Sequence, residues 1–201
     1  FGNIFQSFFT CSIIKGEMTM NYCYVFIGPS GSGKTSLAEA IFQPEQKIIT
    51  YTNRSPRPGE KDQEDYYFVS DNTFNQMIKG NEFAEWDQYA QHKYGSSKAE
   101  IKKKLTVGNC FDVLIANGFW YLYEYFGTVV RPIFITISKE ILQSRLKKRG
   151  DSSEQISARL AVYVEDLAQL KRLKAIPSLL VVSNDGTFQE AADKIKKGLL
   201  I

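Results

Sequence analysis

Hydrophobic and polar positions follow two different periods along most of the chain. Short apolar runs with the length and the β-branched or aromatic content of buried strands occur at residues 22–27, 47–52, 112–115, 131–137 and 178–182. Between these runs, apolar positions recur at helical spacing. Because strands that alternate with helices are joined by crossover connections, the pattern predicts an α/β fold with a parallel core sheet that helices cover on both faces.

Polar residues mark the starts of three predicted helices. In a capping box, a hydroxyl side chain and an acid or amide three residues later satisfy the backbone N–H groups that the first helical turn leaves exposed. The pairs with this spacing are Ser97 with Glu100, Ser152 with Gln155, and Thr187 with Glu190. We expect a helix to begin at each of them.

Residues 51–96 break the alternation of strands and helices. This stretch is rich in turns and alternates apolar with polar positions, so we expect a small antiparallel lobe inserted after the second strand. Within it, Arg54 and Arg57 lie beside two prolines that reduce the entropy of ordering the loop. Guanidinium groups bind phosphate with two parallel hydrogen bonds, which favours an anion site over the alternative of an exposed basic turn paired with nearby acids.

Composition limits the number of folding units, the binding partners and the cellular compartment that we expect. A chain of 201 residues with 43% apolar content can bury one substantial core, so we expect one folding unit with lobes. The net charge of +3 is spread without a block of like charge, which argues against a nucleic-acid or membrane surface. Three cysteines without a CxxC pair and a single histidine disfavour zinc and a disulfide framework, so a reduced, cytoplasmic setting is expected.

Residues 1–19 differ from the rest of the chain. They are aromatic-rich but have neither a basic leader nor a long apolar run. Such a segment is a poor signal peptide and a poor membrane span. We expect an N-terminal extension outside the functional unit, and a packed amphipathic arm is the alternative.

The strongest chemical signal is the sequence Gly-Pro-Ser-Gly-Ser-Gly-Lys-Thr at residues 28–35, between an apolar run and a helix-like segment. This is the GxxxxGK[ST] pattern, in which glycines let backbone N–H groups turn toward phosphate oxygens at a helix N-terminus. Lys34 is then expected to reach the β- and γ-phosphates, and the Thr35 hydroxyl to bind Mg²⁺. A chance Gly/Ser-rich turn is the alternative, which the strand before it and the helix after it disfavour.

A set of segments in a fixed order carries a family resemblance from Tyr22 to Leu200. The segments are GPSGSGKTSL, TNRSPRPGE, DYYFVS, EFAEW, KYGSS, RLKKRG and ARL. In this set the chain resembles the guanylate kinase family. The resemblance implies a P-loop NTPase three-layer fold, with a parallel core sheet, an inserted mixed or antiparallel GMP-binding lobe and a helical lid. It also implies Mg²⁺-dependent transfer from ATP to GMP, giving ADP and GDP.

The resemblance also implies a division of the chain. A guanylate kinase-like domain is expected at residues 20–200. Its expected parts are a core at 20–50, 97–137 and 161–200, a GMP-binding lobe at 51–96 and a lid at 138–160. The expected partners are ATP and GMP, with dGMP as a further acceptor, in a monomer or homodimer that binds neither nucleic acid nor membrane.

Site residues follow from matching motif positions. The ATP-binding set implied by the resemblance is Gly28, Pro29, Ser30, Gly31, Ser32, Gly33, Lys34, Thr35, Ser36, Arg145, Asn184 and Asp185. The GMP-binding set is Thr50, Arg54, Arg57, Tyr66, Glu85, Tyr94, Gly95 and Ser96. The catalytic set is Lys34, Arg54, Arg149 and Arg159, and the metal-binding residue is Thr35. A carboxylate such as Glu85 can accept guanine N1–H and N2–H₂ together, which adenine cannot match.

The chain departs from the family pattern at one place. Guanylate kinases usually carry two acidic residues at the end of the third core strand, where this chain reads Asp112-Val113-Leu114-Ile115-Ala116. We expect no carboxylate at that strand end, because Asp112 comes several residues too early. The expected consequence is weaker control of Mg²⁺ and a looser choice of nucleotide.

Two alternatives remain. FDVL followed by NG, together with SKEILQSRLKKRG and SNDG, resembles ribose 1,5-bisphosphate phosphokinase, but that enzyme has no guanine for Glu85 and Ser96 to bind. A noncatalytic guanylate kinase-like binding module is the second alternative. The intact Gly33, Lys34 and Thr35 favour an enzyme over such a module.

Overall fold

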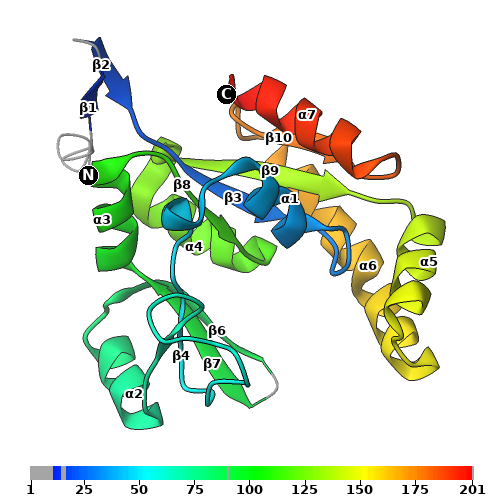
Figure 1. Cartoon of the computed structure of the whole chain (residues 1–201), viewed down its shortest axis with the longest axis horizontal. Helices are drawn as coiled ribbons and strands as arrows, with labels where there is room; N and C mark the ends of the chain where they lie inside the picture. The colour runs from blue at the N-terminus through cyan, green and yellow to red at the C-terminus, as the bar shows by residue number, and fades with distance from the viewer. Residues whose placement is uncertain (1–10, 15–16, 90, 201) are drawn as a thin grey trace. The chain divides into compact units, whose positions relative to one another are not determined.

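The computed structural model describes residues 11–14, 17–89 and 91–200, and side chains are described from Met20 onward (Figure 1). These residues form two compact units. The first unit contains the segment that ends at Cys23, together with Glu45–Asp112 and Trp120–Val130. The second unit contains Tyr24–Pro44, Val113–Phe119 and Arg131 onward. Since these boundaries differ from those of the expected core, lobe and lid, that three-part division stays a prediction.

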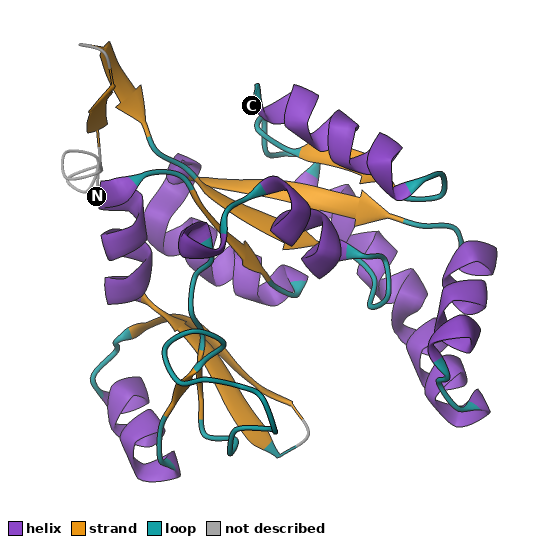
Figure 2. Cartoon of the chain, viewed as in Figure 1, coloured by secondary structure: helices purple, strands orange, loops and turns teal. Residues whose placement is uncertain are grey.

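The core sheet has the strand order β10-β9-β3-β8, and these strands are labelled in Figure 1 and coloured orange in Figure 2. Its strands are β3 (Cys23–Ile27), β8 (Cys110–Val113), β9 (Val130–Thr136) and β10 (Leu180–Ser183). β9 and β10 pair in parallel, with Ile133 opposite Leu180. All five residues of β3 are buried, as a strand with both faces covered requires. The predicted α/β fold with a parallel core sheet is confirmed.

Two predicted strands differ from the observed ones. The run at 112–115 is not one strand, because β8 already ends at Val113 and helix α4 begins at Ala116. The run at 47–52 forms only the short strand β4 (Tyr51–Thr52), and Lys47 makes an isolated bridge to Phe111. A 3₁₀ turn at Pro44–Gln46 comes directly before this segment.

Two helices of the second unit begin at the polar residues that predicted their starts. Ser152 and Thr187 form complete capping boxes at the starts of α6 (Ser153–Leu173) and α7 (Phe188–Leu199). The other two helices of this unit are α1 (Lys34–Ile41) and α5 (Lys139–Arg149). α5 and α6 pack together through a cluster that includes Leu142, Leu146, Ile156 and Tyr163.

The first unit contains a second four-stranded sheet in the order β5-β4-β7-β6. Its remaining strands are β5 (Tyr67–Phe68), β6 (Phe83–Tyr89) and β7 (His92–Ser97). β4 and β5 are parallel, whereas β7 pairs antiparallel with both β4 and β6. The sheet is therefore mixed, which agrees with the mixed or antiparallel lobe that the resemblance implied. It is not antiparallel throughout, because the turn-rich segment between β4 and β5 returns the chain in the same direction.

Three helices complete the described secondary structure of this region. α2 (Asp71–Lys79) buries Phe74 and Met77 against Phe83. α3 (Lys98–Val107) begins at Ser97, whose hydroxyl accepts the backbone N–H of Glu100, and α4 spans Ala116–Phe126. A 3₁₀ turn at Gly127–Val129 leads into β9.

Strands β1 (Cys11–Ile14) and β2 (Glu17–Met20) pair antiparallel. They account for part of the expected N-terminal extension at 1–19. Residues 1–10 lie outside the described residues, so the expectation for that stretch is not tested.

Candidate functional site

The phosphate-binding loop connects the end of β3 to the start of α1. Two glycines give it a path that other residues do not adopt easily. Gly28 has φ 138°, and a Cβ there would lie 2.2 Å from the Ile135 carbonyl oxygen. Gly33 has φ 89°, and a Cβ there would lie 2.7 Å from the Asn184 side-chain nitrogen. The backbone of the loop therefore passes so close to neighbouring atoms at these two positions that a side chain would collide with them.

Lys34 points back into this loop. Its Nζ donates hydrogen bonds to the carbonyl oxygens of Gly28 at 2.7 Å and Pro29 at 2.8 Å. Burial lowers the pKa of Lys34 to about 8, while the charge of Asp166 on α6 opposes that shift. The ammonium group is thus held at the end of β3, where the effect of burial on its pKa exceeds the opposing effect of Asp166.

The loop fits a polyphosphate. The buried Ser32 hydroxyl has no hydrogen-bond partner among the described residues, so it can serve as a donor for a phosphate oxygen. Thr35 and Ser36 are exposed at the start of α1, where a hydroxyl can reach a metal ion bound to phosphate. No group of three or more acidic, histidine or cysteine side chains that could hold a metal occurs within the part of the chain that the structure describes.

Asn184 supports the loop from the segment after β10. Its Nδ2 donates to the Ser32 backbone carbonyl at 2.8 Å, and the backbone carbonyl of Asn184 accepts from Arg145 Nη2 at 2.8 Å. The structure therefore brings these two predicted ATP-binding residues to the loop. Asp185 is engaged differently, because its Oδ1 accepts the backbone N–H of Ser138 at 2.6 Å and so caps the start of α5.

Two arginines of the segment that was expected to form a lid, Arg149 and Arg159, share one carboxylate. Asp151 accepts from Arg149 Nε at 2.8 Å and pairs with Arg159 Nε at 3.2 Å. These arginines lower the pKa of Asp151. Arg159 also donates to the Ser30 hydroxyl, which joins α6 to the phosphate-binding loop. Asp151 was missed at the sequence level, although it directly follows the basic segment that ends at Gly150.

In the first unit, Arg54 is the centre of a cluster of charged and aromatic side chains. It is only 8% exposed, and it forms a two-pronged salt bridge to Glu60 at 2.8 and 2.9 Å. Hydrogen bonding to Glu60, with a smaller contribution from Tyr94, raises the pKa of Arg54 further, so it stays charged. Its Nε has no hydrogen-bond partner among the described residues and can serve as a donor for an anion.

Aromatic rings complete this cluster. The Arg54 guanidinium lies 5.4 Å from the centroid of the Tyr66 ring, and the rings of Tyr66 and Tyr94 are 6.0 Å apart. Arg57 is exposed, and its backbone N–H donates to Glu60 at 2.7 Å. The structure thus brings together Arg54, Tyr66 and Tyr94. Glu60, which bridges the two arginines, was missed because it has the appearance of a solvated charge in the sequence.

Glu85, Ser96 and Asp112 form a second, buried cluster in the same unit. Ser96 donates its backbone N–H to Glu85 Oε1 at 3.0 Å and its hydroxyl to Asp112 Oδ2 at 2.8 Å. Burial, followed by the charge of Asp112, raises the pKa of Glu85 to about 8. Gly95 is required beside them, because a Cβ there would lie 2.8 Å from Trp86 Cβ. Thr50 contributes a carbonyl that accepts the Tyr67 N–H at 3.0 Å.

Asp112 corrects one expectation from the sequence. It is not at the start of its strand but next to the end, since β8 spans Cys110–Val113. Its carboxylate lies in the same cluster as Glu85, so the expectation that no carboxylate occurs near the end of this strand is wrong. The physical reason is that the strand begins two residues earlier than the apolar run at 112–115 indicated.

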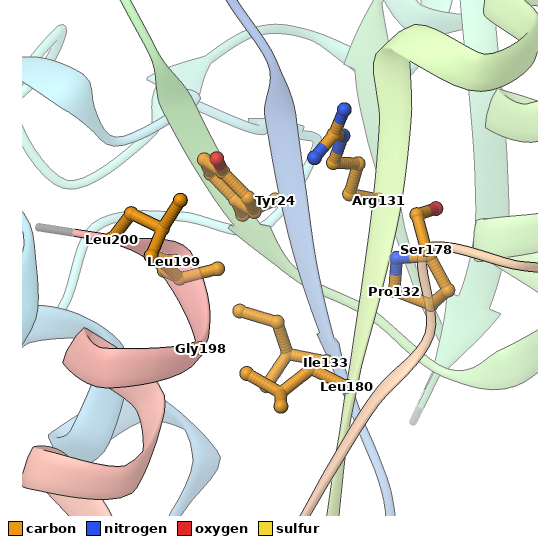
Figure 3. Close-up of a pocket in the computed structure, with 9 residues that line it drawn as sticks. All are labelled: Tyr24, Arg131, Pro132, Ile133, Ser178, Leu180, Gly198, Leu199 and Leu200. Carbon is orange, nitrogen blue, oxygen red and sulfur yellow. The ribbon is translucent and has the colours of Figure 1, made fainter.

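The cavity in Figure 3 is a different feature of the second unit. It is lined by residues at the amino ends of β3, β9 and β10 and by the last turn of α7, among them Tyr24, Arg131 and Leu180. Its volume of about 90 Å³ is too small for a nucleotide. It includes none of the predicted site residues, since the phosphate-binding loop follows the carboxyl end of β3.

The fold and the loop between β3 and α1 define a P-loop nucleotide-binding protein. The family model described as guanylate kinase matches residues 20–199. A guanylate kinase of Nitrosospira multiformis is 38% identical over 72% of this chain and 71% of its own length. One of Caldanaerobacter subterraneus subsp. tengcongensis is 34% identical over 86% of this chain and 83% of its own. The chain belongs to the guanylate kinase family.

Solved structures agree with this fold. A guanylate kinase from Anaplasma phagocytophilum superimposes with a TM-score of 0.63 at 24% identity, covering 90% of this chain and 85% of that one. A gluconokinase from Sinorhizobium meliloti gives a TM-score of 0.52 at 17% identity, covering 90% of this chain and 93% of that one. At these identities the likeness concerns the fold.

Proposed function

We propose that this protein catalyses phosphoryl transfer from ATP to GMP, giving ADP and GDP. The observation that carries the proposal is the phosphate-binding loop with Lys34 drawn into it by two carbonyls, in a chain of the guanylate kinase family. The polyphosphate of ATP takes the place of those carbonyls at the Lys34 ammonium. The Ser32 hydroxyl and the backbone N–H groups of the loop supply further donors.

The acceptor is held by the clusters of the first unit. Arg54, Arg57, Tyr66 and Tyr94 bind the GMP phosphate, with the free Arg54 Nε as one donor. Glu85 accepts hydrogen bonds from guanine N1–H and N2–H₂, which selects guanine over adenine. Ser96 is proposed to contact guanine together with Glu85, and Thr50 and Gly95 belong to the same proposed GMP-binding set.

The transfer itself needs no covalent protein intermediate. In the second unit, Lys34, Arg149 and Arg159 neutralise charge that spreads over the oxygens of the transferred group. Arg54 of the first unit belongs to the same proposed catalytic set. For Arg149 and Arg159 this requires that their pairing with Asp151 give way to phosphate. Arg145, Asn184 and Asp185 complete the proposed ATP-binding set. Mg²⁺, bound by Thr35 and the ATP phosphates, supplies further charge neutralisation.

Several finer points are part of the proposal. dGMP is a further acceptor, and the protein acts as a monomer or a homodimer without nucleic-acid or membrane partners. A cytoplasmic setting is supported by Cys23 and Cys110, which are buried, adjacent and free. Separately, none of the helices within the described part of the chain is long and apolar enough to cross a membrane.

The alternative of a kinase acting on ribose 1,5-bisphosphate is not favoured, because the relatives found are guanylate kinases. The buried Glu85 and Ser96 also have the polar groups that a base requires and a sugar phosphate does not. A noncatalytic binding module is disfavoured by the intact loop around Lys34.

The direct test is a panel of nucleoside monophosphates with ATP and Mg²⁺, with ADP release as the readout. We expect rapid ADP release with GMP and little with AMP, CMP or UMP. Lys34→Ala is expected to lower kcat by roughly 10²-fold or more, because the charge at the transferred phosphates is lost. Circular dichroism serves as the folding control, and near-normal turnover by a folded Lys34→Ala variant would contradict the proposed site.

A further inference from the structure

The four-stranded sheet of the first unit carries the proposed GMP-binding side chains on one face. Successive residues of a strand point to opposite faces, and residues paired across two strands share a face. Tyr94 and Ser96 lie two residues apart on β7, so both point to the same face. Tyr94 pairs with Thr52 of β4, and Ser96 pairs with Glu85 of β6. The proposed contacts to guanine and to the GMP phosphate therefore gather on this face.

A second polar network occupies the opposite face of the sheet. Tyr51 of β4 pairs with Tyr67 of β5, and their rings stack with centroids 4.5 Å apart. The Tyr67 hydroxyl donates to Glu100 Oε2 at 3.2 Å, and the Ser97 hydroxyl accepts the Glu100 N–H at 3.1 Å. Glu100 lies on α3, which follows β7 directly (Figure 1), and it is only 5% exposed. A buried carboxylate thus holds Tyr67 on the face away from the proposed site.

The register of β5 depends on side chains, because its backbone fixes it weakly. The strand has 2 residues and follows the turn-rich segment 53–66. Two backbone hydrogen bonds join it to β4, from Tyr67 N–H to the Thr50 carbonyl at 3.0 Å and from Val69 N–H to the Thr52 carbonyl at 2.9 Å. A shift of one residue can restore such bonds, but it turns every side chain to the other face. The side chains of Tyr66 and Tyr67 would then exchange faces.

Glu100 opposes such a shift. A shifted strand would withdraw the Tyr67 hydroxyl from a buried carboxylate whose other oxygen has no hydrogen-bond partner among the described residues and lies 3.7 Å from Lys104. Leaving a buried polar group unpaired is costly. Burial, followed by the charge of Glu100, raises the pKa of Tyr67 to about 12, so the phenol keeps its proton and remains a donor at neutral pH. The hydrogen bond therefore favours one register of β5.

The residues on both sides of Tyr67 pack against Arg54. The ring centroid of Tyr66 lies 5.4 Å from the Arg54 guanidinium, and that of Phe68 lies 5.8 Å from it. The Tyr66 ring also lies 6.0 Å from the ring of Tyr94. The register of β5 therefore decides whether Tyr66 joins the other side chains that are proposed to bind the GMP phosphate.

We propose that Glu100 is a positioning residue for the acceptor: through its hydrogen bond from Tyr67 it fixes the register of β5 and so holds Tyr66 at the GMP phosphate. This inference rests on the proposed function, because it requires that Tyr66 contact that phosphate. Glu100 itself lies on the opposite face of the sheet from the site, so it acts only through Tyr67.

The test is steady-state kinetics of Tyr67→Phe, with GMP and ATP varied in turn. This variant keeps the ring that stacks on Tyr51 but removes the donor to Glu100. KM for GMP is expected to rise by about 5- to 10-fold, because Tyr66 is correctly placed in only a fraction of the molecules. kcat is expected to change little, since saturating GMP selects that fraction. KM for ATP is expected to stay unchanged, because the phosphate-binding loop belongs to the second unit.

Two variants of Glu100 separate the hydrogen bond from the rest of the side chain. Glu100→Gln keeps an oxygen that can accept from Tyr67, so KM for GMP is expected to stay close to that of the unmodified protein. Glu100→Leu has a similar size but no acceptor, so KM for GMP is expected to rise as in Tyr67→Phe. Tyr121→Phe is the matched control, because it removes a phenol hydroxyl from an exposed position on α4. Urea unfolding shows whether each variant is folded under the assay conditions.

An unchanged KM for GMP in Tyr67→Phe overturns the inference. An equal rise in KM for GMP and KM for ATP also overturns it, since the network would then stabilise the fold without positioning the acceptor. If Tyr67→Phe does not fold, the comparison at Glu100 decides: recovery by Gln supports the inference, and a Gln variant as impaired as the Leu variant overturns it. Absence of transfer to GMP by the unmodified protein overturns the proposed function instead.

Discussion

The ionised forms of Lys34 and Glu85 have opposite charges. Burial shifts the pKa of each toward 8, because it disfavours both charged forms. Removing water disfavours the charged form, so the pKa of Lys34 falls and that of Glu85 rises. Each group is then ready for a ligand that restores its charge, a polyphosphate for Lys34 and a pair of N–H donors for Glu85. At both places, burial outweighs the partner that the folded chain provides, which is Asp166 for Lys34 and Ser96 for Glu85.

Replacement of Glu85 tests base recognition at this scale. Glu85→Ala is expected to raise KM for GMP by roughly 10- to 100-fold, because two hydrogen bonds to guanine are lost in a buried site. kcat is expected to change much less, since Glu85 does not touch the transferred phosphate. Steady-state kinetics with GMP and AMP measures both effects. An unchanged preference for GMP over AMP would show that the base is recognised elsewhere.

At the scale of elements, the sequence predicted the capped helix starts and misplaced two strands. Hydroxyl caps at Ser152 and Thr187 were identified because both members of each box are local in sequence. The end of β8 was not, since Val113-Leu114-Ile115 continues the apolar pattern beyond the point where the chain leaves the sheet. Glu60 and Asp151 were missed for a related reason, because nothing in a sequence distinguishes a solvated acid from one that pairs with a functional arginine.

The caps give an element-scale prediction. Thr187 accepts the Glu190 N–H at 3.2 Å, and Glu190 in turn accepts the Thr187 N–H at 2.9 Å. Thr187→Ala is expected to lower the free energy of unfolding by about 1 kcal/mol. The matched control is Ser153→Ala, because Ser153 is exposed in the first turn of α6 and its hydroxyl has no hydrogen-bond partner among the described residues.

Urea unfolding of both variants measures the difference. Equal losses of stability in the two variants would mean that the α7 cap contributes nothing beyond the general effect of removing a hydroxyl.

At the scale of the whole molecule, each compact unit is assembled from segments far apart in the sequence. The sequence predicted the type of fold because periodicity and the phosphate-binding loop are local. It could not predict which segments form each unit, since that depends on contacts between distant residues. The cluster of Glu85, Ser96 and Asp112 is an example: three residues from β6, β7 and β8 become neighbours only after folding.

Glu85 also predicts how stability depends on pH. Its pKa is about 8 in the folded chain against 4.5 in the unfolded chain, so between these values the folded state binds more protons. Stability is therefore expected to decrease as pH rises from about 4.5 to about 8, by a few kcal/mol at most. The carboxylates with lowered pKa change the stability below this pH range, and Lys34 changes it above this range.

Urea unfolding at pH 5.5 and pH 8 is the measurement. Glu85→Gln, which cannot ionise, is expected to remove most of the difference between the two pH values. A protein as stable at pH 8 as at pH 5.5, with no change in this variant, would contradict the burial of an ionisable Glu85.

The shared carboxylate of Asp151 has a consequence for selectivity. Arg149 and Arg159 carry two positive charges, and Asp151 compensates one of them. A phosphate that binds both guanidinium groups must therefore displace the Asp151 carboxylate. The internal acid thus competes with any incoming anion for these two arginines, and a polyphosphate, which has the most negative oxygens to offer, competes with it best.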